Sequence, residues 1–550
     1  MAHVEFGTRF LTPSTYPSQD LLSLDAFSQD YDRLNEREQL QLSYQRARVI
    51  SQTQTLEDIL YLKPKFWLLY RDMIWTKDSA AATLVFIQYN LAAGTLAPFV
   101  LDRPDLVPLM KSILEFKTSA QYLLTEVGHG LDARNLETTA TLLANGEFDL
   151  HSPTKDSAKY MPMTTPQEGF EREIADGLVR LIPKRAGSKI AGHSITTFDH
   201  VRLPSLALLG TLSKAPNLRT SFTAGIGRVG IGTLALATLN IPFLKMAAYI
   251  AGTYSFRRTV GGSDGRRSSI IHFRTQHVSI MHALAESAIF EAYADEAINK
   301  FVAEKNPAVQ HALGACFKAA IGTATQTRLF QLSERCGAQG LFKHNQIIGL
   351  QLEARGINIA EGDILVLCIR LASELLIGRY EMPKPRDPSC LLARYEAGLF
   401  KEAQGLLKEI GGKHRSDEFN RLVLPLCQPL IEAIGCRMAY EAAVTANCHA
   451  DLITLYEAGV MMRDRSWFVE NLGMKRVAIL RKEDRCIKKL MPHLKQLLEQ
   501  TGAAPYVTAP IVSEDKWDGF VDQMETHIGP NTISQEDIHK NRLAMGGSKI

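Results

Sequence analysis

The chain has 550 residues, of which 45% are hydrophobic and 22% are charged, and its formal net charge is +3. This is ordinary globular composition, and the length predicts two to four structural units. The small net charge, without a basic block or an Arg-rich helix, argues against a nucleic-acid partner.

The first part of the chain is predicted to be helical. Residues 20–120 place apolar side chains at helical spacing in LNEREQLQLSYQRARVISQT and AAATLVFIQYNLAAGTLAPFVL. No basic segment followed by an apolar one precedes them, so the sequence predicts no secretory signal. We expect residues 1–121 to form an N-terminal helical domain.

The next segment changes to a strand pattern. LETTATLLANGEFDLHSPT is rich in Thr and alternates, and Asn145-Gly146 lies between its halves, which predicts a hairpin with a type I′ turn. Further strands are predicted at Gly177–Ile182 and Ser194–Val201. We therefore expect a small central β-domain at residues 122–205.

Helical periodicity returns after this segment and continues to the end of the chain. It predicts a helical bundle domain at 206–385 and a second helical domain at 386–550, with a linker near EMPKPRDPSC. The predicted fold class is mainly α with a small central β-domain.

The most apolar run is Ile231–Tyr254. Asn240, Pro242 and Lys245 interrupt it, so it predicts a buried core helix and not a membrane span.

A glycine-rich stretch, SFTAGIGRVGIGTLAL, contains G-x-G-x-x-G at Gly225, Gly227 and Gly230. A dinucleotide-binding fingerprint needs a strand before it and an acidic residue about 20 positions after it. The preceding residues form a poor strand, and MAAYIAGTY follows at that distance. We predict instead that Gly225–Gly232 lets a helix pass close to its neighbours.

The cysteines do not form a metal-binding pattern. All eight lie between Cys316 and Cys486, with no C-x-x-C pair and no histidine at metal-ligand spacing. This distribution favours buried, reduced thiols in an intracellular protein, and we predict no metal site.

Four short stretches carry the functional signal: YLLTEVGHGLDARNLETTATL (122–142), HSPTKDSAKYMP (151–162), RRTVGGSDGRRSSIIHFRTQ (257–276), and SERCGAQGLFKHN (333–345) followed by IAEGDILVLCIRLASELLIGRY (359–380). Together they resemble the acyl-CoA oxidase branch of the acyl-CoA dehydrogenase family, over about residues 60 to 480. The resemblance implies an N-terminal helical domain, a central β-domain, one or two C-terminal helical domains, and FAD as cofactor.

The resemblance also implies which residues bind FAD. The family's Thr-Glu turn at the flavin ring corresponds to Thr125 and Glu126, with Gly128 beside it; a turn hydrogen bond is the alternative role for Thr125. Tyr160 stands where the family has Trp, and we expect it to take over ring packing.

A second set of FAD contacts comes from the helical region. Arg257 and Gln276 correspond to family residues that reach the phosphates and adenine, often from a partner subunit. Gly337 and Gly340 correspond to the glycines near the adenosine, although Ala338 replaces one of them. Arg258, Arg266 and Arg267 fit a solvated turn equally well, and for His129 and His193 we expect turn or packing roles.

The main catalytic candidate is Glu361. Family oxidases carry a Glu-Gly-Glu-like turn whose first Glu removes the α-proton of the acyl thioester, and here the turn is Glu361-Gly362-Asp363, with Asp363 assigned to the cofactor site. The helix dipole favours the ionised carboxylate, whereas burial favours the neutral form. A base needs a pKa near the working pH, so we predict that burial dominates. A simple helix-capping role for Glu361 is the alternative.

The predicted function is FAD-dependent oxidation of an acyl-CoA or similar thioester to the 2,3-unsaturated product. Glu361 takes the α-proton, a hydride passes to flavin N5, and O2 reoxidises the flavin to give H2O2. Only MTTPQEGFEREIAD separates Pro162 from Gly177, so the β-domain is shorter than in the family and the flavin pocket is more open, reshaped or absent. Two alternatives therefore stay open: a flavoenzyme of the same fold acting on a non-CoA or carrier-bound substrate, and a flavin-free, non-redox member of the fold.

The resemblance further implies a homodimer with an FAD site shared between subunits. The chain ends in Ser548-Lys549-Ile550, which is similar to the peroxisomal S-K-L address. We predict a peroxisomal location, and otherwise a cytoplasmic one.

Overall fold

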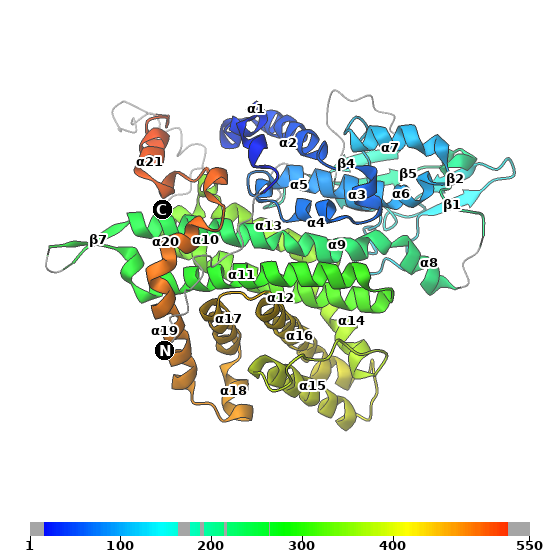
Figure 1. The fold of residues 1–550 in the computed structure, drawn as a ribbon. Helices are drawn as coiled ribbons and strands as arrows, with labels where there is room; N and C mark the ends of the chain where they lie inside the picture. The colour runs from blue at the N-terminus through cyan, green and yellow to red at the C-terminus, as the bar shows by residue number, and fades with distance from the viewer. Residues whose placement is uncertain (1–15, 163–176, 188–191, 214–216, 263–264, 526–550) are drawn as a thin grey trace, which may run out of the picture.

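The computed structural model describes residues 16–162, 177–187, 192–213, 217–262 and 265–525. Long central helices form the body of the molecule, with the N-terminal helices and the strands on one side and most of the C-terminal helices on the other (Figure 1). The fold is mainly helical with small sheets, which confirms the predicted fold class. The C-terminal tripeptide and residues 163–176 lie outside the described residues.

The N-terminal layer confirms the predicted helical character of residues 20–120. Its helices are α1 (Asp25–Ser28), α2 (Glu36–Ser51), α3 (Leu56–Leu60), α4 (Pro64–Tyr70), α5 (Ser79–Phe86), α6 (Gly94–Val100) and α7 (Val107–Leu114). A capping box between Asn35 and Glu38 begins α2. A π-helical segment, η4 (Ile87–Ala93), joins α5 to α6, and all seven of its residues are buried. Such π segments occur frequently at functional sites.

Six short strands form two antiparallel, three-stranded sheets. The strands are β1 (Thr139–Leu142), β2 (Phe148–His151), β3 (Lys159–Pro162), β4 (Gly177–Leu181), β5 (His193–Phe198) and β6 (Val201–Leu203), in the orders β1-β2-β6 and β3-β5-β4. The predicted hairpin and the strand at Gly177–Ile182 are confirmed. The edge strand β1 is exposed at every residue.

The predicted type I′ turn of the hairpin is wrong. That turn needs positive φ at both central residues, and here only Gly146 has it, at +85°. The Gly146 N–H donates to the Leu143 carbonyl (3.0 Å) and the Leu143 N–H donates to the Glu147 carbonyl (2.8 Å). This is a type I turn followed by a glycine bulge, which needs one left-handed residue instead of two.

The predicted strand Ser194–Val201 is only partly correct. β5 ends at Phe198, and the chain turns at His200, whose φ is +54°. β6 then pairs with β2 of the other sheet, so this short segment connects the two sheets.

The body contains α8 (Leu218–Gly225), α9 (Gly227–Thr238), α10 (Asn240–Arg257), α11 (Arg274–Ala303), α12 (Pro307–Arg335) and α13 (Ile347–Ile359). Helices α9 and α10 follow one another along the body (Figure 1). Three helical stretches, Ser79–Val100, Gly227–Arg257 and Phe419–Thr445, are long and apolar enough to span a membrane, but the fold buries 83%, 94% and 61% of their apolar windows. The prediction of a buried core helix at Ile231–Tyr254 is confirmed.

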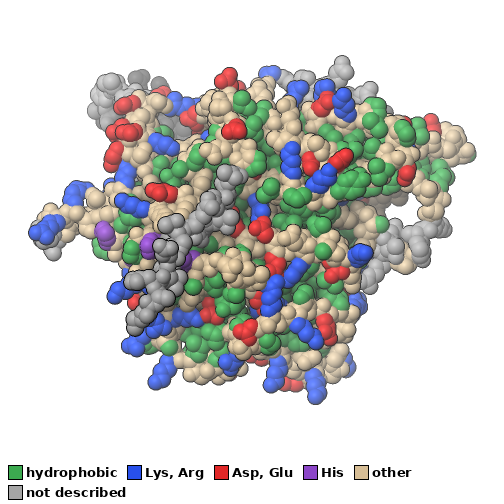
Figure 2. Space-filling model, viewed as in Figure 1, with side chains coloured by type: hydrophobic (Ala, Val, Ile, Leu, Met, Phe, Trp, Pro, Cys, Tyr) green, Lys and Arg blue, Asp and Glu red, His purple; other side chains and the backbone are tan. Residues whose placement is uncertain are grey.

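A two-stranded arm, β7 (Thr259–Gly261) and β8 (Arg267–Ser269), projects from the end of α10 (Figure 1). Figure 2 shows positively charged side chains at its tip, and Arg266 and Arg267 of the arm are exposed. This agrees with the solvated-turn alternative for these two arginines.

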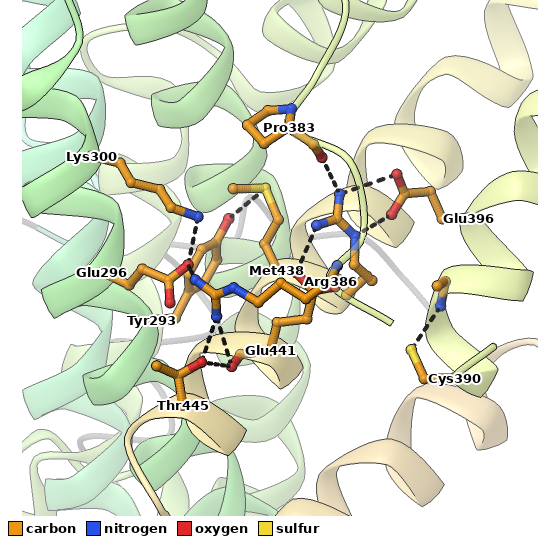
Figure 3. Close-up of polar contacts among 12 residues, drawn as sticks. Tyr293, Glu296, Lys300, Pro383, Arg386, Cys390, Glu396, Met438, Glu441 and Thr445 are labelled. Atoms are coloured by element: carbon orange, nitrogen blue, oxygen red, sulfur yellow. Dashed lines mark hydrogen bonds and ion pairs between the residues drawn. The ribbon is translucent and has the colours of Figure 1, made fainter. Parts of the chain in front are cut away.

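The C-terminal helices are α14 (Ile364–Leu376), α15 (Leu391–Glu409), α16 (Leu424–Thr445), α17 (Ala450–Arg463), α18 (Arg465–Leu472), α19 (Arg476–Leu490), α20 (Leu494–Glu499) and α21 (Glu514–Val521). The predicted linker lies between α14 and α15. Arg437 of α16 donates to Glu396 (2.6 Å), to Glu441 (2.9 Å) and to the Pro383 carbonyl (3.2 Å), and Arg386 pairs with Glu296 of α11 (2.8 Å) (Figure 3). The linker is therefore attached to α16 through Pro383 and to α11 through Arg386.

The eight cysteines all fall within the described residues and are all unpaired. Six are buried and Cys390 and Cys448 are partly buried. This confirms the prediction of buried, reduced thiols.

Candidate active site

Glu361 lies on the short connection between α13 and α14. Its φ is +52° and that of Gly362 is +107°, both in the left-handed region. A non-glycine residue with positive φ is uncommon, and such backbone persists only where the surroundings hold it. Asp363 accepts the Val366 N–H (3.2 Å) and caps α14. The helix cap is therefore Asp363, and the capping alternative for Glu361 is wrong.

The Glu361 side chain points into the protein. Its Oε2 accepts a hydrogen bond from Asn90 Nδ2 (3.1 Å), which also donates to the Arg228 carbonyl (3.0 Å). The Thr233 hydroxyl donates to the Glu361 carbonyl (2.7 Å). Side chain and backbone of Glu361 are thus held by two segments, η4 and α9.

Gly232 of α9 makes room for this carboxylate. A Cβ added at Gly232 would lie 1.2 Å from Glu361 Oε2. At Gly225, Gly227 and Gly230 a Cβ would meet nothing within 4 Å. The predicted close approach is confirmed at Gly232 alone, and the neighbour there is Glu361. Helix α8, and not a strand, leads directly into these glycines, so they lack the context of a dinucleotide fingerprint, as predicted.

Burial raises the pKa of Glu361 from 4.5 to about 8, and the charge of Lys318 and the Asn90 hydrogen bond only partly oppose it. The upward direction of this pKa shift agrees with the expected dominance of burial. Burial also raises the pKa of the Tyr70 and Tyr122 hydroxyls, and the nearby Glu361 adds to both effects. A carboxylate of this kind can exchange a proton near neutral pH.

Three residues assigned to the flavin lie together in the β region. The Thr125 carbonyl accepts the Tyr160 N–H (2.8 Å), and the Gly128 N–H donates to the Asp156 carbonyl (2.9 Å). The Thr125 amide and hydroxyl form no hydrogen bond with a residue that the structure describes. Tyr160 is 41% exposed, and its ring lies 5.8 Å from that of His193, whose buried Nδ1 has no hydrogen-bond partner among the described residues. A donor pair, an exposed ring and an unused nitrogen fit a planar, polar-edged group such as a flavin.

Glu126 anchors this turn. Its carboxylate accepts the N–H groups of Glu137 (2.8 Å) and Thr138 (3.0 Å) and pairs with Lys159 Nζ (2.8 Å). Sequence reasoning had grouped Glu126 with Thr125 at the flavin, but its side chain is 1% exposed and both oxygens are occupied by protein donors. Its carboxylate therefore stabilises the turn by joining it to residues 137, 138 and 159.

The β region meets the helix that leads to Glu361. A Cβ at Gly187, between β4 and β5, would lie 3.1 Å from Leu352 of α13, and one at Gly356 would lie 3.7 Å from Arg185. The segment that precedes β5 therefore packs on α13, and β5 carries His193. The turn that carries Thr125 and the Glu361 loop therefore belong to adjoining parts of the fold.

The second set of predicted FAD residues lies elsewhere. Arg257 pairs with Glu514 (2.7 Å), and its guanidinium lies over the Trp517 ring. Gln276 Nε2 donates to Ser255 Oγ (2.8 Å) and to the Arg335 carbonyl (2.7 Å).

The glycines of this second set follow α12. Gly337 has φ +59°, and a Cβ at Gly340 would lie 2.0 Å from the Ser333 carbonyl oxygen. Both positions need glycine, because of backbone conformation at one and close packing at the other.

One chain does not bring the two sets together. Gly232 and Arg257 are separated by 25 positions along the nearly continuous helix α9–α10, which corresponds to roughly 35 Å. Figure 1 shows the arm that follows Arg257 at one end of the body and strands β1, β2 and β5 toward the other.

Two cavities have volumes of about 630 and 450 Å³, and the larger is lined by Phe256 and His277, the sequence neighbours of Arg257 and Gln276. The larger borders α10, α11 and α19, and the smaller borders α14 and the start of α16. Neither is lined by Glu361. Its carboxylate is instead covered by Asn90 and by the α9 backbone.

His151, Asp199 and His200 form a polar group that sequence spacing did not reveal. One ligand atom from each lies within 4.8 Å of the others. The two imidazole rings stack in parallel, 4.0 Å apart, and His200 Nδ1 is engaged by Asp149 (2.9 Å). Stacked rings direct their in-plane lone pairs side by side, so this geometry does not converge on one ion.

Comparison with known proteins gives a consistent set of similarities. Residues 232–376 match the family model of the acyl-CoA oxidase C-alpha1 domain. Acyl-coenzyme A oxidase 2, peroxisomal, from Arabidopsis thaliana is 25% identical over 366 residues, covering 57% of this chain and 53% of that protein. The chain spans about half the length of the curated relatives it matches.

Solved structures share the fold. Acyl-CoA oxidase1 from Yarrowia lipolytica superposes with a TM-score of 0.78 at 15% identity, covering 96% of this chain and 92% of that one. Acyl-CoA oxidase-1 from Caenorhabditis elegans, complexed with FAD and ATP, gives a TM-score of 0.73 at 15% identity, with 95% and 91% covered. The matched C-alpha1 segment contains both Gly232 and Glu361, the residues in contact at the candidate site.

Proposed function

From its kinship with the acyl-CoA oxidases, we propose that the chain is an FAD-dependent enzyme that oxidises an acyl-CoA or a similar acyl thioester to the 2,3-unsaturated product. The observation that carries the proposal is the inward-facing Glu361 carboxylate, with a pKa raised to about 8 by burial. It lies on a strained loop inside the segment that matches the oxidase family model.

Glu361 acts as the base that removes the α-proton. Burial makes its carboxylate more basic than an exposed one, and the hydrogen bond from Asn90 to Oε2 directs it. The Thr233 bond to its carbonyl fixes the backbone while the proton moves. A base that is held in one orientation needs little reorganisation before it can accept the proton.

FAD, when bound, supplies the hydride acceptor and, in an oxidase, passes the electrons to O2 to give H2O2. Thr125 would hold it through its unused amide and hydroxyl, and Tyr160 would cover its ring. Gly128 keeps the turn close to Asp156. A solved structure of the same fold is complexed with FAD, which supports FAD as the cofactor. Asp363 is placed at this site by the sequence resemblance alone, and its side chain caps α14.

The separation between Gly232 and Arg257 supports a homodimer with a shared cofactor site. Arg257, Gln276, Gly337 and Gly340 would then reach the FAD of the partner subunit. The peroxisomal names of the curated relatives support a peroxisomal location.

The proposal is tested with purified protein. We expect a flavin absorption spectrum, and peroxide on addition of a fatty acyl-CoA. Glu361→Gln should retain flavin and lose about 10²–10⁴-fold in turnover, the usual contribution of a general base. Glu353→Gln is the control, because Glu353 is a buried carboxylate on α13, the helix that leads into the Glu361 loop.

Each other outcome selects an alternative. Flavin that is bound but not reduced by acyl-CoAs would favour a same-fold enzyme for a carrier-bound or non-CoA substrate. A colourless protein would favour the flavin-free member. Full activity of Glu361→Gln would refute the assignment of the base.

A further inference from the structure

Lys318 of α12 is a buried lysine that the proposed reaction does not use. Its side chain is fully enclosed, with 0% exposed. Lysine is almost never fully buried unless its ammonium is paired. Here Nζ donates to the Ala360 carbonyl (2.5 Å) and to the Gly362 carbonyl (2.7 Å), the residues immediately before and after Glu361.

We propose that Lys318 is a positioning residue: it clamps the backbone on both sides of Glu361 and supplies the positive charge opposite which that carboxylate ionises. The first half of the proposal depends only on the fold. The second rests on the proposed function of Glu361 as base.

The loop needs such a clamp because its backbone is unfavourable. Glu361 and Gly362 are both left-handed, and non-glycine residues hold this conformation only under constraint. Lys318 binds the loop from α12, and Thr233 binds the Glu361 carbonyl from α9. Three consecutive carbonyls, from Ala360 to Gly362, are therefore fixed by two helices.

Charge gives the clamp a second effect. The titratable groups that face this loop are Tyr70, Tyr122, Arg228, Lys318 and Asp363. Burial keeps the two tyrosines uncharged, and Arg228 donates to the Ile59 carbonyl. Lys318 is the cation that opposes the rise in the pKa of Glu361. Burial lowers the pKa of Lys318 itself to about 7, and the charges of Glu361 and Asp363 oppose that fall, so each ion favours the other.

Two variants separate the clamp from the charge. Lys318→Met removes both, and Lys318→Gln removes the charge but keeps a donor for one carbonyl. Lys245→Met is the matched control, because Lys245 is equally buried but pairs with Glu291 and Tyr16, away from the loop. If Lys318→Met fails to fold, Lys318→Gln carries the test.

The clamp is measured by hydrogen–deuterium exchange of peptides that cover residues 356–367. We expect exchange at least several-fold faster in Lys318→Met, an intermediate rate in Lys318→Gln, and no local change in Lys245→Met. This readout needs neither substrate nor flavin, so it stands even if no acyl-CoA is oxidised. Unchanged exchange in folded Lys318→Met would overturn the clamp.

The charge is measured by the pH dependence of kcat/KM. Loss of the cation raises the pKa of Glu361, so the acid limb should move to higher pH by about one unit or more in both Lys318 variants. If the wild-type chain oxidises no acyl-CoA, the shift is measured by protein unfolding instead. The unfolding free energy of Glu361→Gln is compared with that of its parent across pH, once in the wild-type background and once in Lys318→Met. The pH at which Glu361→Gln becomes stabilising should then be higher in the Lys318→Met background. No displacement in either measurement would overturn the charge effect.

Discussion

Glu126, in the turn before β1, and Glu361, in the α13–α14 loop, are both carboxylates held by protein hydrogen bonds, yet their pKa values move in opposite directions. Burial pushes the pKa of Glu126 upward, but hydrogen bonds from Lys159, Thr138 and Glu137 outweigh it and lower the value to about 2. Glu361 receives one side-chain hydrogen bond, from Asn90, and burial raises its pKa to about 8.

The comparison shows that the balance between burial and the hydrogen bonds a carboxylate receives decides the direction of its pKa shift. A fully satisfied carboxylate stays ionised and acts as a structural anchor. A carboxylate with few donors keeps its proton until near neutral pH. Its pKa is then suited to a base, but the unfolding free energy of the protein falls as pH rises. The β region thus contains the anchor, and the helical body contains the candidate base.

The largest effect is expected when the anchor is broken. Glu126→Gln leaves Lys159 as an uncompensated buried charge, which costs about 3–5 kcal/mol of unfolding free energy. The deficit should be greatest near neutral pH and shrink in acid, because a lowered pKa stabilises the fold above pH 4.5 and that contribution is lost as pH falls toward 2. Urea unfolding across pH measures it. Glu147→Gln, in the β1–β2 turn, is the control and should change little, and equal losses for the two variants would contradict the anchor role.

Glu361→Gln should have the opposite sign. Because the folded-state pKa is raised, the wild-type chain loses stability as pH rises from 4.5 to about 8. The variant lacks this loss, so its unfolding free energy relative to wild type should rise over the same interval, by on the order of 3 kcal/mol. Thermal or urea unfolding at pH 5 and pH 8 measures the difference. A pH-independent difference would mean that Glu361 is not buried as a carboxylate.

The resemblance to the acyl-CoA oxidases pointed to Glu361, and local pattern predicted only the helix entry on which it lies. The apolar face of α14 begins at Ile364, so the residues just before it had to form a helix entry. The β1–β2 hairpin, strand β4 and the buried run Ile231–Tyr254 were also predictable from local pattern, whereas strands β3, β6, β7 and β8 were not predicted. Turn detail was not, since Asn145-Gly146 fits a type I′ turn and a type I turn with a glycine bulge equally well by composition.

The partners of Glu361 could not be found in this way. Asn90 lies 271 positions from Glu361 in the sequence, and Thr233 lies 128 positions away. Their roles depend on how η4, α9 and α12 pack, which periodicity does not specify. Asn90 and Lys318 did leave a signal: each is a polar residue within an otherwise buried apolar helix, and such residues need a partner.

A smaller effect is expected where the carboxylate meets α9. Gly232→Ala places a methyl group on Glu361 Oε2 and forces the side chain or the helix to move, at about 1–3 kcal/mol. Turnover should fall with it, because the base is displaced. Gly230→Ala, on the same helix with nothing within 4 Å, should instead gain a few tenths to about 1 kcal/mol from helix propensity. Equal effects of the two substitutions on unfolding would contradict the contact.

The smallest effect concerns Asp363, which the sequence resemblance assigns to the cofactor site and the structure shows as the N-cap of α14. As the cap of α14, it accepts the Val366 N–H, and Asp363→Ala should cost about 1 kcal/mol. Asp363→Asn keeps a capping oxygen and should cost less. Flavin content, read from the absorption spectrum, separates the two roles: if Asp363→Asn stays folded but loses flavin, the residue contacts the cofactor, and if it keeps flavin while only Asp363→Ala is destabilised, capping is its function. In the second case Asp363 has a structural role, and Glu361 is the carboxylate of this loop to which the proposed proton transfer is assigned. The contrast between a structural carboxylate and a candidate base then holds within the loop as well as between Glu361 and Glu126.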